Sequence, residues 1–156
     1  MLNATVRLAA EGDLTSIMEI AQQSVSAAQW NVGEYKNMLL GGSSLSGDIL
    51  LVIHGEGADH KIYGFLAAHE VSGEWEIENL AICESARRRG LGLRLLKEFL
   101  RIAKDRDAKD IFLEVRESNV AARSLYSKCT FVEAGRRRSY YHNPEEDALI
   151  LRFSFS

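Results

Sequence analysis

The sequence predicts an α/β (α+β) fold, in which a mixed sheet of about six to seven strands is flanked by about four helices. Three observations support this. Expected elements follow in the order β-α-α-β-β-β-α-β-α-β-β, so strands outnumber helices. The central strand–helix–strand unit should be a right-handed crossover between parallel neighbours, which gives a mixed sheet. The length of 156 residues suffices for one domain with a buried core, expected to span residues 1–156.

The N-terminal third is expected to hold a strand, two helices and a second strand. Residues 5–9 form a short strand, and Asp13 can cap the next helix. That helix has apolar residues along one face: Leu14, Ile17, Ala21 and Val25. A second helical piece holds Tyr35, Met38 and Leu39, and the stretch 41–44 ends it. Residues 48–54 are apolar and β-branched, which favours a strand.

The middle of the chain is expected to hold three strands and a long helix. A turn at 55–60 leads into the strand 61–71, and a tight connection at 72–73 leads into the strand 74–83. The helix that follows runs to about residue 107. In the strand 110–116, Glu114 belongs to the set that alternates with the apolar residues Ile111, Leu113 and Val115.

The C-terminal part is expected to hold a short helix and two strands. Ser118 or Asn119 caps the helix 120–128. The strands are 131–135 and 147–155, and the basic and aromatic segment 136–142 lies between them, followed by a turn at Pro144. We find no internal repeat, low-complexity tract or linker.

Composition narrows the class of protein. A hydrophobic content of 46% and a charged content of 26% are ordinary for a globular domain. The net charge of −3 argues against a general nucleic-acid binder. No signal peptide or membrane-spanning run is visible, and Cys83 and Cys129 lack metal-ligand spacing. We therefore expect a reduced, cytoplasmic domain of the size of an enzyme, without a metal site.

The most informative stretch is the turn Arg87-Arg88-Arg89-Gly90-Leu91-Gly92, which joins an apolar strand to an amphipathic helix. A helix start presents free backbone N–H groups and partial positive charge. Glycines let an anion approach the backbone closely, and arginines suit phosphate oxygens. The stretch indicates a diphosphate site, with a solvated basic face as the alternative. It is not a Walker loop, because Gly-Lys-Ser/Thr is missing, nor a dinucleotide fingerprint, because position 95 is leucine.

The pattern Arg87-x-x-Gly90-x-Gly92, followed by Asn119, Leu125-Tyr126 and Phe131, resembles the GNAT N-acetyltransferases. Within that superfamily, three blocks look like the bacterial ribosomal-protein-alanine (RimI-type) N-acetyltransferases. These blocks are 113–122 (LEVRESNVAA), 137–141 (RRSYY) and 146–151 (EDALIL). The similarity is close over residues 75–151 and only in outline before them.

The resemblance implies a GNAT fold that transfers an acetyl group from acetyl-CoA to an amine and releases coenzyme A. In the family, the strand before the turn diverges from the strand after the helix, and the pantetheine arm lies between them. Carried onto this chain, the resemblance gives Glu114 as general base and Tyr126 as general acid. The implied cofactor contacts are Leu80, Ala81, Ile82, Arg87, Arg88, Arg89, Gly90, Leu91, Gly92, Leu93 and Asn119.

The chemistry gives both catalytic candidates a purpose. An α-amino group has an unperturbed pKa of about 8, so a base must take its proton before it can attack a carbonyl. Glu114 lies mid-strand, an unusual place for a carboxylate unless it is used or paired; a salt bridge with Arg116 or Arg137 is the alternative. The leaving thiolate gains from a donor, and a phenol with an unperturbed pKa near 10 can hold that proton. Tyr126 as an ordinary core aromatic is the alternative.

Several weaker candidates accompany this pair. Glu76 and Glu78 could act as a base through water or simply line a solvated face. Cys83 could accept the acetyl group in a ping-pong scheme. Arg136-Arg137-Arg138 with Tyr140 and Tyr141 could cover an incoming peptide end, contact ribosomal RNA, or be a solvated charge run. The remaining candidates, for the acceptor groove, are Trp30 and Tyr35.

The chain departs from the family pattern at Thr130, where glycine is usual, and in lacking a proline before the turn. A left-handed backbone would strain threonine, so we expect a different turn there. The expected acceptor is a protein N-terminus, first of all that of a ribosomal protein. We expect no membrane or direct nucleic-acid partner, and a monomer or weak dimer. A small-amine acetyltransferase and a non-catalytic acyl-CoA- or ribosome-binding module are the alternatives.

Overall fold

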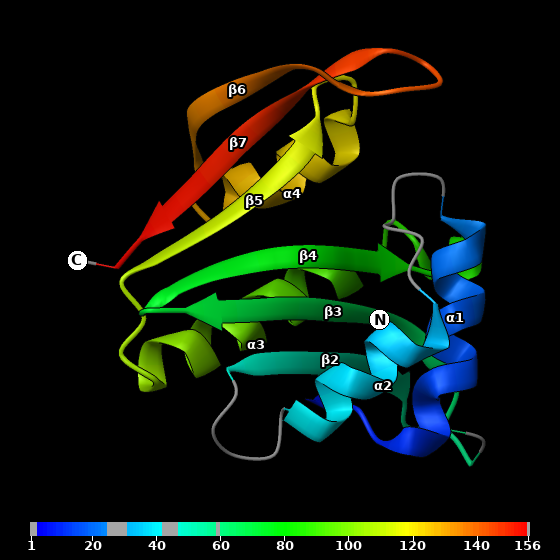
Figure 1. Ribbon diagram of the computed structural model, residues 1–156. Helices are drawn as coiled ribbons and strands as arrows, with labels where there is room; N and C mark the ends of the chain where they lie inside the picture. Colours follow the sequence, from blue (N-terminus) through cyan, green and yellow to red (C-terminus); the bar gives the residue numbers. More distant parts are fainter. Residues whose placement is uncertain (1–2, 25–30, 42–46, 59, 156) are drawn as a thin grey trace.

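The central sheet opens in its middle, so that three C-terminal strands diverge from the four that precede them (Figure 1). The computed structural model describes residues 3–24, 31–41, 47–58 and 60–155. The elements are β1 (Ala4–Leu8), η1 (Glu11–Asp13), α1 (Leu14–Gln23), α2 (Val32–Gly41), β2 (Asp48–Gly55), β3 (Ile62–Val71), β4 (Glu74–Ile82), η2 (Glu84–Ala86), α3 (Leu91–Asp105), β5 (Asp110–Arg116), α4 (Val120–Lys128), β6 (Val132–Tyr141) and β7 (Glu146–Ser154). Apart from the two short 3-10 helices, this order confirms the predicted one.

The described strands form one seven-stranded sheet in the order β1-β2-β3-β4-β5-β7-β6. Strands β4 and β5 are parallel and the other neighbours are antiparallel. This confirms the predicted mixed sheet, in which the strands that precede and follow α3 in the sequence are parallel neighbours. The parallel pairing is short: it begins at Glu74↔Asp110 and ends at Ile77↔Leu113. Past that point the two strands separate.

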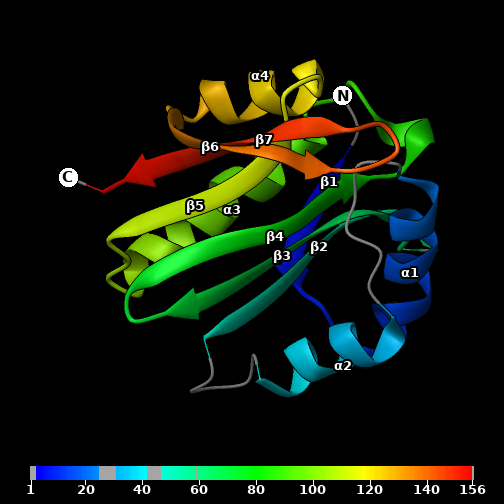
Figure 2. The same ribbon diagram turned by 45° about the horizontal axis from the view of Figure 1, so that its top comes forward.

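Helices cover both faces of the sheet (Figure 2). Helices α1 and α2 pack on one face, where Ile17 and Tyr35 meet Val52 and Phe65. Helix α3 packs on the other face, and its buried side chains are Leu91, Leu95, Leu96, Phe99 and Ala103. The centre of the sheet is buried between these two apolar layers, which explains the continuous apolar run of β2.

A bulge in β4 reverses which side chains face which helix layer. Ala67 pairs with Asn79 and Ala68 with Ile77, so Glu78 has no partner in the register. Before the bulge, Trp75 and Ile77 pack in the α3 layer; after it, Ala81 packs with α1 and α2. The bulge therefore lies where β4 leaves β5.

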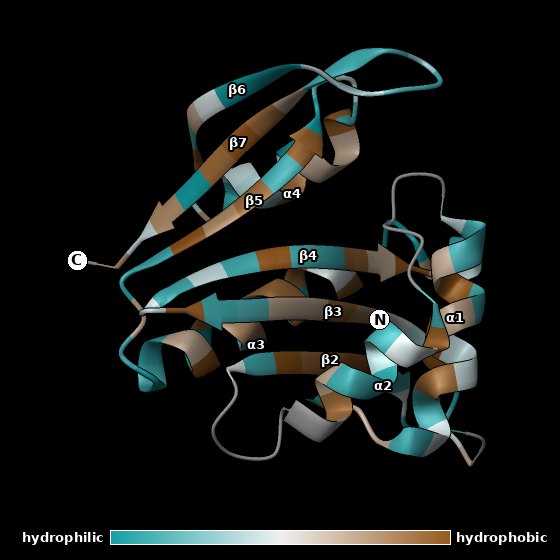
Figure 3. Ribbon diagram, viewed as in Figure 1, coloured by the Kyte–Doolittle hydropathy of each residue, from teal (hydrophilic) through white to brown (hydrophobic). Residues whose placement is uncertain are grey.

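Strand β6 and the turn that joins it to β7 are polar, whereas the middle of β7 is apolar, as the hydropathy colours show (Figure 3). The strand expected at 131–135 extends to Tyr141, so the segment 136–141 is strand rather than a separate connection. None of the residues of β6, all of which are described, is buried. Strand β6 lies at the edge of the sheet and pairs with β7 alone.

Two local expectations are wrong. Asp13 makes no side-chain cap to α1; its carboxylate accepts hydrogen bonds from Arg7 at 2.7 and 3.0 Å and from the Ala10 N–H at 2.8 Å. Thr130 keeps the left-handed turn, with φ of 65°.

Val25, expected on the apolar face of α1, lies outside the described residues. Among the described helices, none is long and apolar enough to cross a bilayer.

Candidate active site

The separation of β4 from β5 opens a cleft of about 840 Å³ between the two parts of the sheet. Residues of β4, the start of α3, β5 and α4 line it. Predicted site residues that line this cleft are Leu80, Ala81, Ile82, Arg87, Arg88, Gly90, Leu91, Gly92, Leu93, Glu114, Asn119 and Tyr126. Arg89 does not line it. Residues far apart in the sequence thus meet at one opening.

The first turn of α3 points its backbone N–H groups toward this cleft. The Arg94 N–H already bonds to the Gly90 carbonyl, so the free donors are those of residues 91–93. Gly90 takes the left-handed conformation with φ of 78°, which starts the helix. A Cβ on Gly92 would lie 3.3 Å from Leu125 Cδ2, so the glycine lets the helix start lie close to α4. Free donors and partial positive charge fit a diphosphate.

Arg87 makes contacts within the protein. Its Nε donates to the Ile82 carbonyl at 3.0 Å, and its guanidinium also donates to Ser24 Oγ at 3.4 Å. These bonds hold the end of β4 against the turn. Arg88 lines the cleft in a left-handed conformation, with φ of 63°.

The backbone of β4 is exposed toward the cleft on one side. Leu80, Ala81 and Ile82 pair with Leu66, Phe65 and Gly64 of β3, but they lie beyond the last pair with β5. Main-chain groups that would have bonded to β5 in a continuous sheet therefore face the cleft. Such groups can bind an extended polar ligand.

Glu114 lies in a wall shared by two cavities. Its neighbours Leu113 and Val115 pack in the core on the α3 side, so Glu114 projects toward the opposite face. There it also lines a hollow of about 490 Å³ with His69, Glu76 and Arg137. Its Oε1 forms a salt bridge with Arg137 Nε at 2.6 Å, and 19% of the Glu114 side chain is exposed. The salt bridge with Arg137, one of the alternatives above, is present.

Tyr126 reaches the cleft from the other face. It is the buried residue of α4, and its ring packs edge-on against Phe131 with centroids 5.4 Å apart. Burial raises the pKa of its phenol. A phenol with a raised pKa stays protonated at neutral pH, so the donor form is the one present in the cleft. Glu114 and Tyr126 thus approach one opening from opposite faces of the sheet.

Asn119 confirms one of the two expected caps of α4. Its Oδ1 accepts the Ala122 N–H at 3.1 Å. The Nδ2 group donates to no described residue and lies at the rim of the cleft, where it can donate to a ligand.

The weaker candidates fall in different places. Tyr35 is fully buried and its hydroxyl accepts a hydrogen bond from Asn79, so it belongs to the core and not to a groove; Trp30 lies outside the described residues. Cys83 lines a separate hollow of about 620 Å³ beside α1. Glu78 lines the main cleft, and burial, together with the nearby Glu76 carboxylate, raises its pKa.

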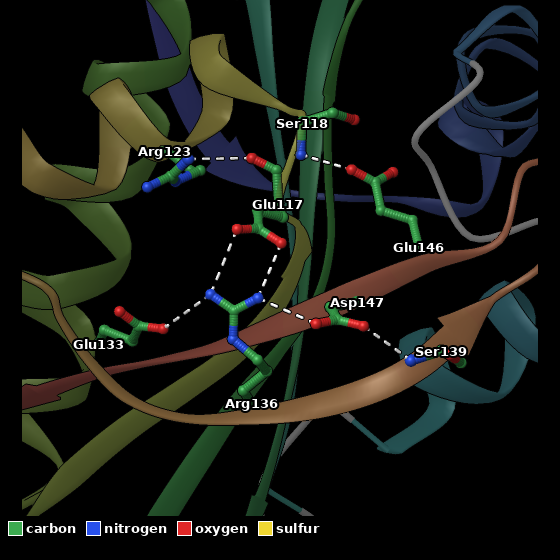
Figure 4. Close-up of polar contacts among 8 residues, drawn as sticks. All are labelled: Glu117, Ser118, Arg123, Glu133, Arg136, Ser139, Glu146 and Asp147. Atoms are coloured by element: carbon green, nitrogen blue, oxygen red, sulfur yellow. Dashed lines mark hydrogen bonds and ion pairs between the residues drawn. The ribbon is translucent and has the colours of Figure 1, made fainter.

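The basic segment of β6 is mostly neutralised by carboxylates. Arg136 bonds to Glu117 and Asp147 (Figure 4), and Arg137 bonds to Glu114. Tyr141 lines the cleft, with Arg116 4.3 Å from the centre of its ring. The segment is exposed to solvent, and two of its three arginines are paired with carboxylates.

Sequence reasoning missed the contacts around Glu117, Glu146 and Asp147. These carboxylates stood only in the blocks of family resemblance, and no local pattern pairs them with residues of another strand. One signal was available in the sequence. Three consecutive arginines at 136–138 are followed by two acidic residues, Glu146 and Asp147, at the start of the next strand.

The chain is similar to a known family, to known sequences and to a solved structure. The chain matches the Acetyltransferase (GNAT) family over residues 16–131. A [ribosomal protein bS18]-alanine N-acetyltransferase of Salmonella typhimurium is 37% identical over 101 residues, 64% of this chain and 68% of that protein. One of Haemophilus influenzae is 31% identical over 142 residues, 89% of this chain and 90% of that protein. The crystal structure of the Escherichia coli ribosomal-protein-S18-alanine N-acetyltransferase superposes with a TM-score of 0.84 at 28% identity, covering 98% of this chain and 94% of that one.

Proposed function

The chain belongs to the acetyltransferase (GNAT) family, and we propose that it acetylates the N-terminal α-amine of a protein, with a ribosomal protein as the acceptor. The observation that carries the proposal is the cleft between β4 and β5. It joins a helix start suited to a diphosphate, an open strand backbone, and a carboxylate and a phenol that enter from opposite faces. The relatives named above act on ribosomal protein S18, which supports this acceptor class.

We assign the donor side of the cleft as follows. Acetyl-CoA, the donor used by the family, supplies the acetyl group as an activated thioester. Backbone N–H groups of residues 91–93 hold its diphosphate, with Arg88 adding charge. Main-chain groups of residues 80–82 orient its extended arm, and Asn119 Nδ2 donates to it. These contacts fix the reacting carbon near Glu114 and Tyr126.

We assign the proton transfers to Glu114 and Tyr126. Arg137 bonds to Oε1 of Glu114, while Oε2 receives no hydrogen bond from the described residues and is free to take a proton from the amine. The Tyr126 hydroxyl donates its proton to the departing sulfur. Each transfer contributes about 10²–10⁴-fold in rate.

We place the acceptor in the hollow of about 490 Å³ on the far side of Glu114. From this hollow an N-terminal residue can reach past Glu114 into the cleft, so that its amine lies beside both the carboxylate and the thioester carbon that it attacks. The same hollow gives a second candidate function: three carboxylates, Glu74, Glu76 and Glu114, line it and would also attract a small cationic amine. We propose that the enzyme works in the cytoplasm, the compartment in which ribosomal proteins are synthesised.

The test is a panel of acceptors incubated with acetyl-CoA and analysed by mass spectrometry. The panel holds N-terminal peptides of ribosomal proteins, the same peptides blocked at the N-terminus, lysine peptides and polyamines. We expect acetylation of free N-termini and none of the blocked peptides. Acetylation of polyamines alone would replace the proposed acceptor with the small-amine alternative.

A further inference from the structure

The loop 117–119 joins the strand that carries Glu114 to the helix that carries Tyr126. Its conformation therefore sets how these two side chains lie relative to each other. Of the residues of α4, all of which are described, Tyr126 is the buried one, and Val120 at its start is 70% exposed. In the first turn of this helix, Ala122 packs against the core while partly buried. Polar contacts supply the other constraints on this end.

Arg136 makes the main contact with this loop (Figure 4). Its two terminal nitrogens donate to the two oxygens of Glu117, at 2.8 and 3.2 Å. The same guanidinium donates to Asp147 Oδ2 at 2.9 Å, and the other oxygen of Asp147 accepts the Ser139 N–H at 2.9 Å. We call Arg136, Glu117 and Asp147 the Arg136 bridge; it ties the loop to both strands of the C-terminal hairpin.

A second carboxylate holds the next residue of the loop. Glu146 Oε2 accepts the Ser118 N–H at 2.5 Å, and its Oε1 accepts a hydrogen bond from Arg116 Nη1 at 3.2 Å. The Glu117 N–H donates to the Asp147 carbonyl at 3.2 Å, which adds a backbone link to the same strand. Both loop residues that precede the cap Asn119, Glu117 and Ser118, are therefore bonded to the start of β7.

We propose that the Arg136 bridge, with Glu146, is a positioning device for acetyl transfer: it fixes the loop 117–119 so that Asn119 and Tyr126 stay aligned with Glu114. This inference rests on the proposed function for the roles of Glu114 and Tyr126. The side chains of the bridge and Glu146 do not line the cleft, so they act through the loop and not on the substrates.

The exposure of these groups predicts which property they affect. The exposed fractions are 36% for Arg136, 45% for Glu117 and 26% for Asp147. Ion pairs at this exposure contribute little to the stability of a fold. A small displacement of a reacting group, in contrast, costs a large factor in rate. Loss of the bridge should therefore lower the rate without unfolding the protein.

The test compares Arg136→Gln with a matched control, Arg152→Gln. Arg152 also bridges strands of this half of the sheet, to Asp110 at 2.9 Å, but at the opposite end of β5 and away from the loop. We expect Arg136→Gln to lower kcat about tenfold, to leave KM for acetyl-CoA within about threefold, and to shift Tm no more than the control. The control should retain kcat. Glu117→Gln, which keeps the shape of the side chain, should repeat the loss if Arg136→Gln folds poorly.

A double-mutant cycle with Tyr126→Phe separates positioning from general weakening. If the bridge acts by placing Tyr126, the loss caused by Arg136→Gln should shrink to about twofold or less in the Tyr126→Phe background. Equal losses in both backgrounds would overturn the proposal, as would wild-type kcat in both Arg136→Gln and Glu117→Gln.

Hydrogen exchange of the Ser118 and Asn119 amides tests the bridge without any substrate. We expect exchange at least about tenfold faster in Arg136→Gln than in the wild type, and unchanged in Arg152→Gln. Unchanged exchange would overturn the bridge even if the enzyme is active. A wild type that acetylates no N-terminal peptide would contradict the proposed function while this measurement still decides on the bridge.

Discussion

The two parts of the sheet are held together in different ways. Around β2, β3 and β4, apolar side chains are buried on both faces, and α3 adds five buried residues. Around β5, β7 and β6, only one face is apolar, and arginine–carboxylate pairs join the strands at both ends of β5. The first part places the diphosphate turn, and the second places Glu114, Asn119 and Tyr126. Fold stability and catalytic geometry are therefore governed by separable sets of residues.

The largest expected effect is on the rate, from Glu114→Gln in the polar part. The substitution keeps the side-chain shape but removes the base, so kcat should fall about 10²–10⁴-fold while the affinity for coenzyme A stays within about threefold. Steady-state kinetics and calorimetry measure the two. Asp110→Asn, at the other end of the same strand, is the control and should keep its rate. A Glu114→Gln variant with wild-type kcat would show that another group acts as the base.

In the apolar part of the sheet, around β2, β3 and β4, the largest expected effect is on the free energy of unfolding. Phe99 is fully buried in α3, with its ring 5.6 Å from that of Trp75. Phe99→Ala should lower the free energy of unfolding by about 3–5 kcal/mol, because it removes apolar burial and leaves a cavity. Val132→Ala in β6, where the side chain is 62% exposed, should cost less than about 0.5 kcal/mol. Urea denaturation of both variants checks the contrast, and equal costs would contradict it.

Tyr126→Phe should separate the ring from the hydroxyl. The ring remains in the core, so stability should change little, while kcat should fall about 10²-fold through loss of the proton donor. Because burial raises the pKa of Tyr126, the donor form persists to higher pH than for an exposed tyrosine. Ionisation of this phenol should not lower kcat/KM below about pH 10. A loss of rate in Tyr63→Phe of the same size would remove the assignment.

Gly90→Ala should have a smaller effect, on binding. No heavy atom lies within 4 Å of a Cβ built on Gly90, so the cost is that of the left-handed backbone alone, about 1–2 kcal/mol. Rearrangement of the turn should weaken coenzyme A binding by about tenfold or less, as measured by calorimetry. Gly12→Ala is the control, because its surroundings are equally open and its φ is not left-handed. Equal affinities for both variants would mean that the turn does not hold the diphosphate.

The smallest expected effect is a dependence of stability on pH at Asp13. Burial alone would raise the pKa of Asp13, but hydrogen bonds from Arg7 and Ala10 outweigh it and lower the pKa. A carboxylate with a lowered pKa stabilises the fold above its unfolded pKa of about 3.9 and loses that contribution as pH falls through the folded value. Asp13→Asn should therefore lower stability by less than about 1 kcal/mol at pH 7, and by less still near pH 3. A difference that grew in acid would contradict this sign.

The order of elements could be predicted because it depends on local patterns. The alternation in residues 110–116, the cap at Asn119 and the glycines of the turn all act within a few residues. The extent of β6 could not be predicted, since an edge strand with no buried face carries no apolar period. Asp13 looked like a cap because nothing local shows that Arg7 of β1 competes for it.

The site could be predicted only in part for the same reason. Family resemblance pointed to Glu114 and Tyr126, and the structure adds that they enter one cleft from opposite faces. The bulge at Glu78, which opens that cleft, depends on the register with β3. The bonds of Arg136 depend on residues from three separate segments of the chain. Such long-range contacts leave no periodic signal in the sequence.

A crystal structure of the chain with coenzyme A would show directly whether the cleft between β4 and β5 is the cofactor site. We expect the diphosphate within hydrogen-bond distance of the N–H groups of residues 91–93, and the extended arm between β4 and β5 with its sulfur next to Tyr126. Coenzyme A bound instead in the hollow beside Cys83, or on a surface away from both strands, would contradict this expectation.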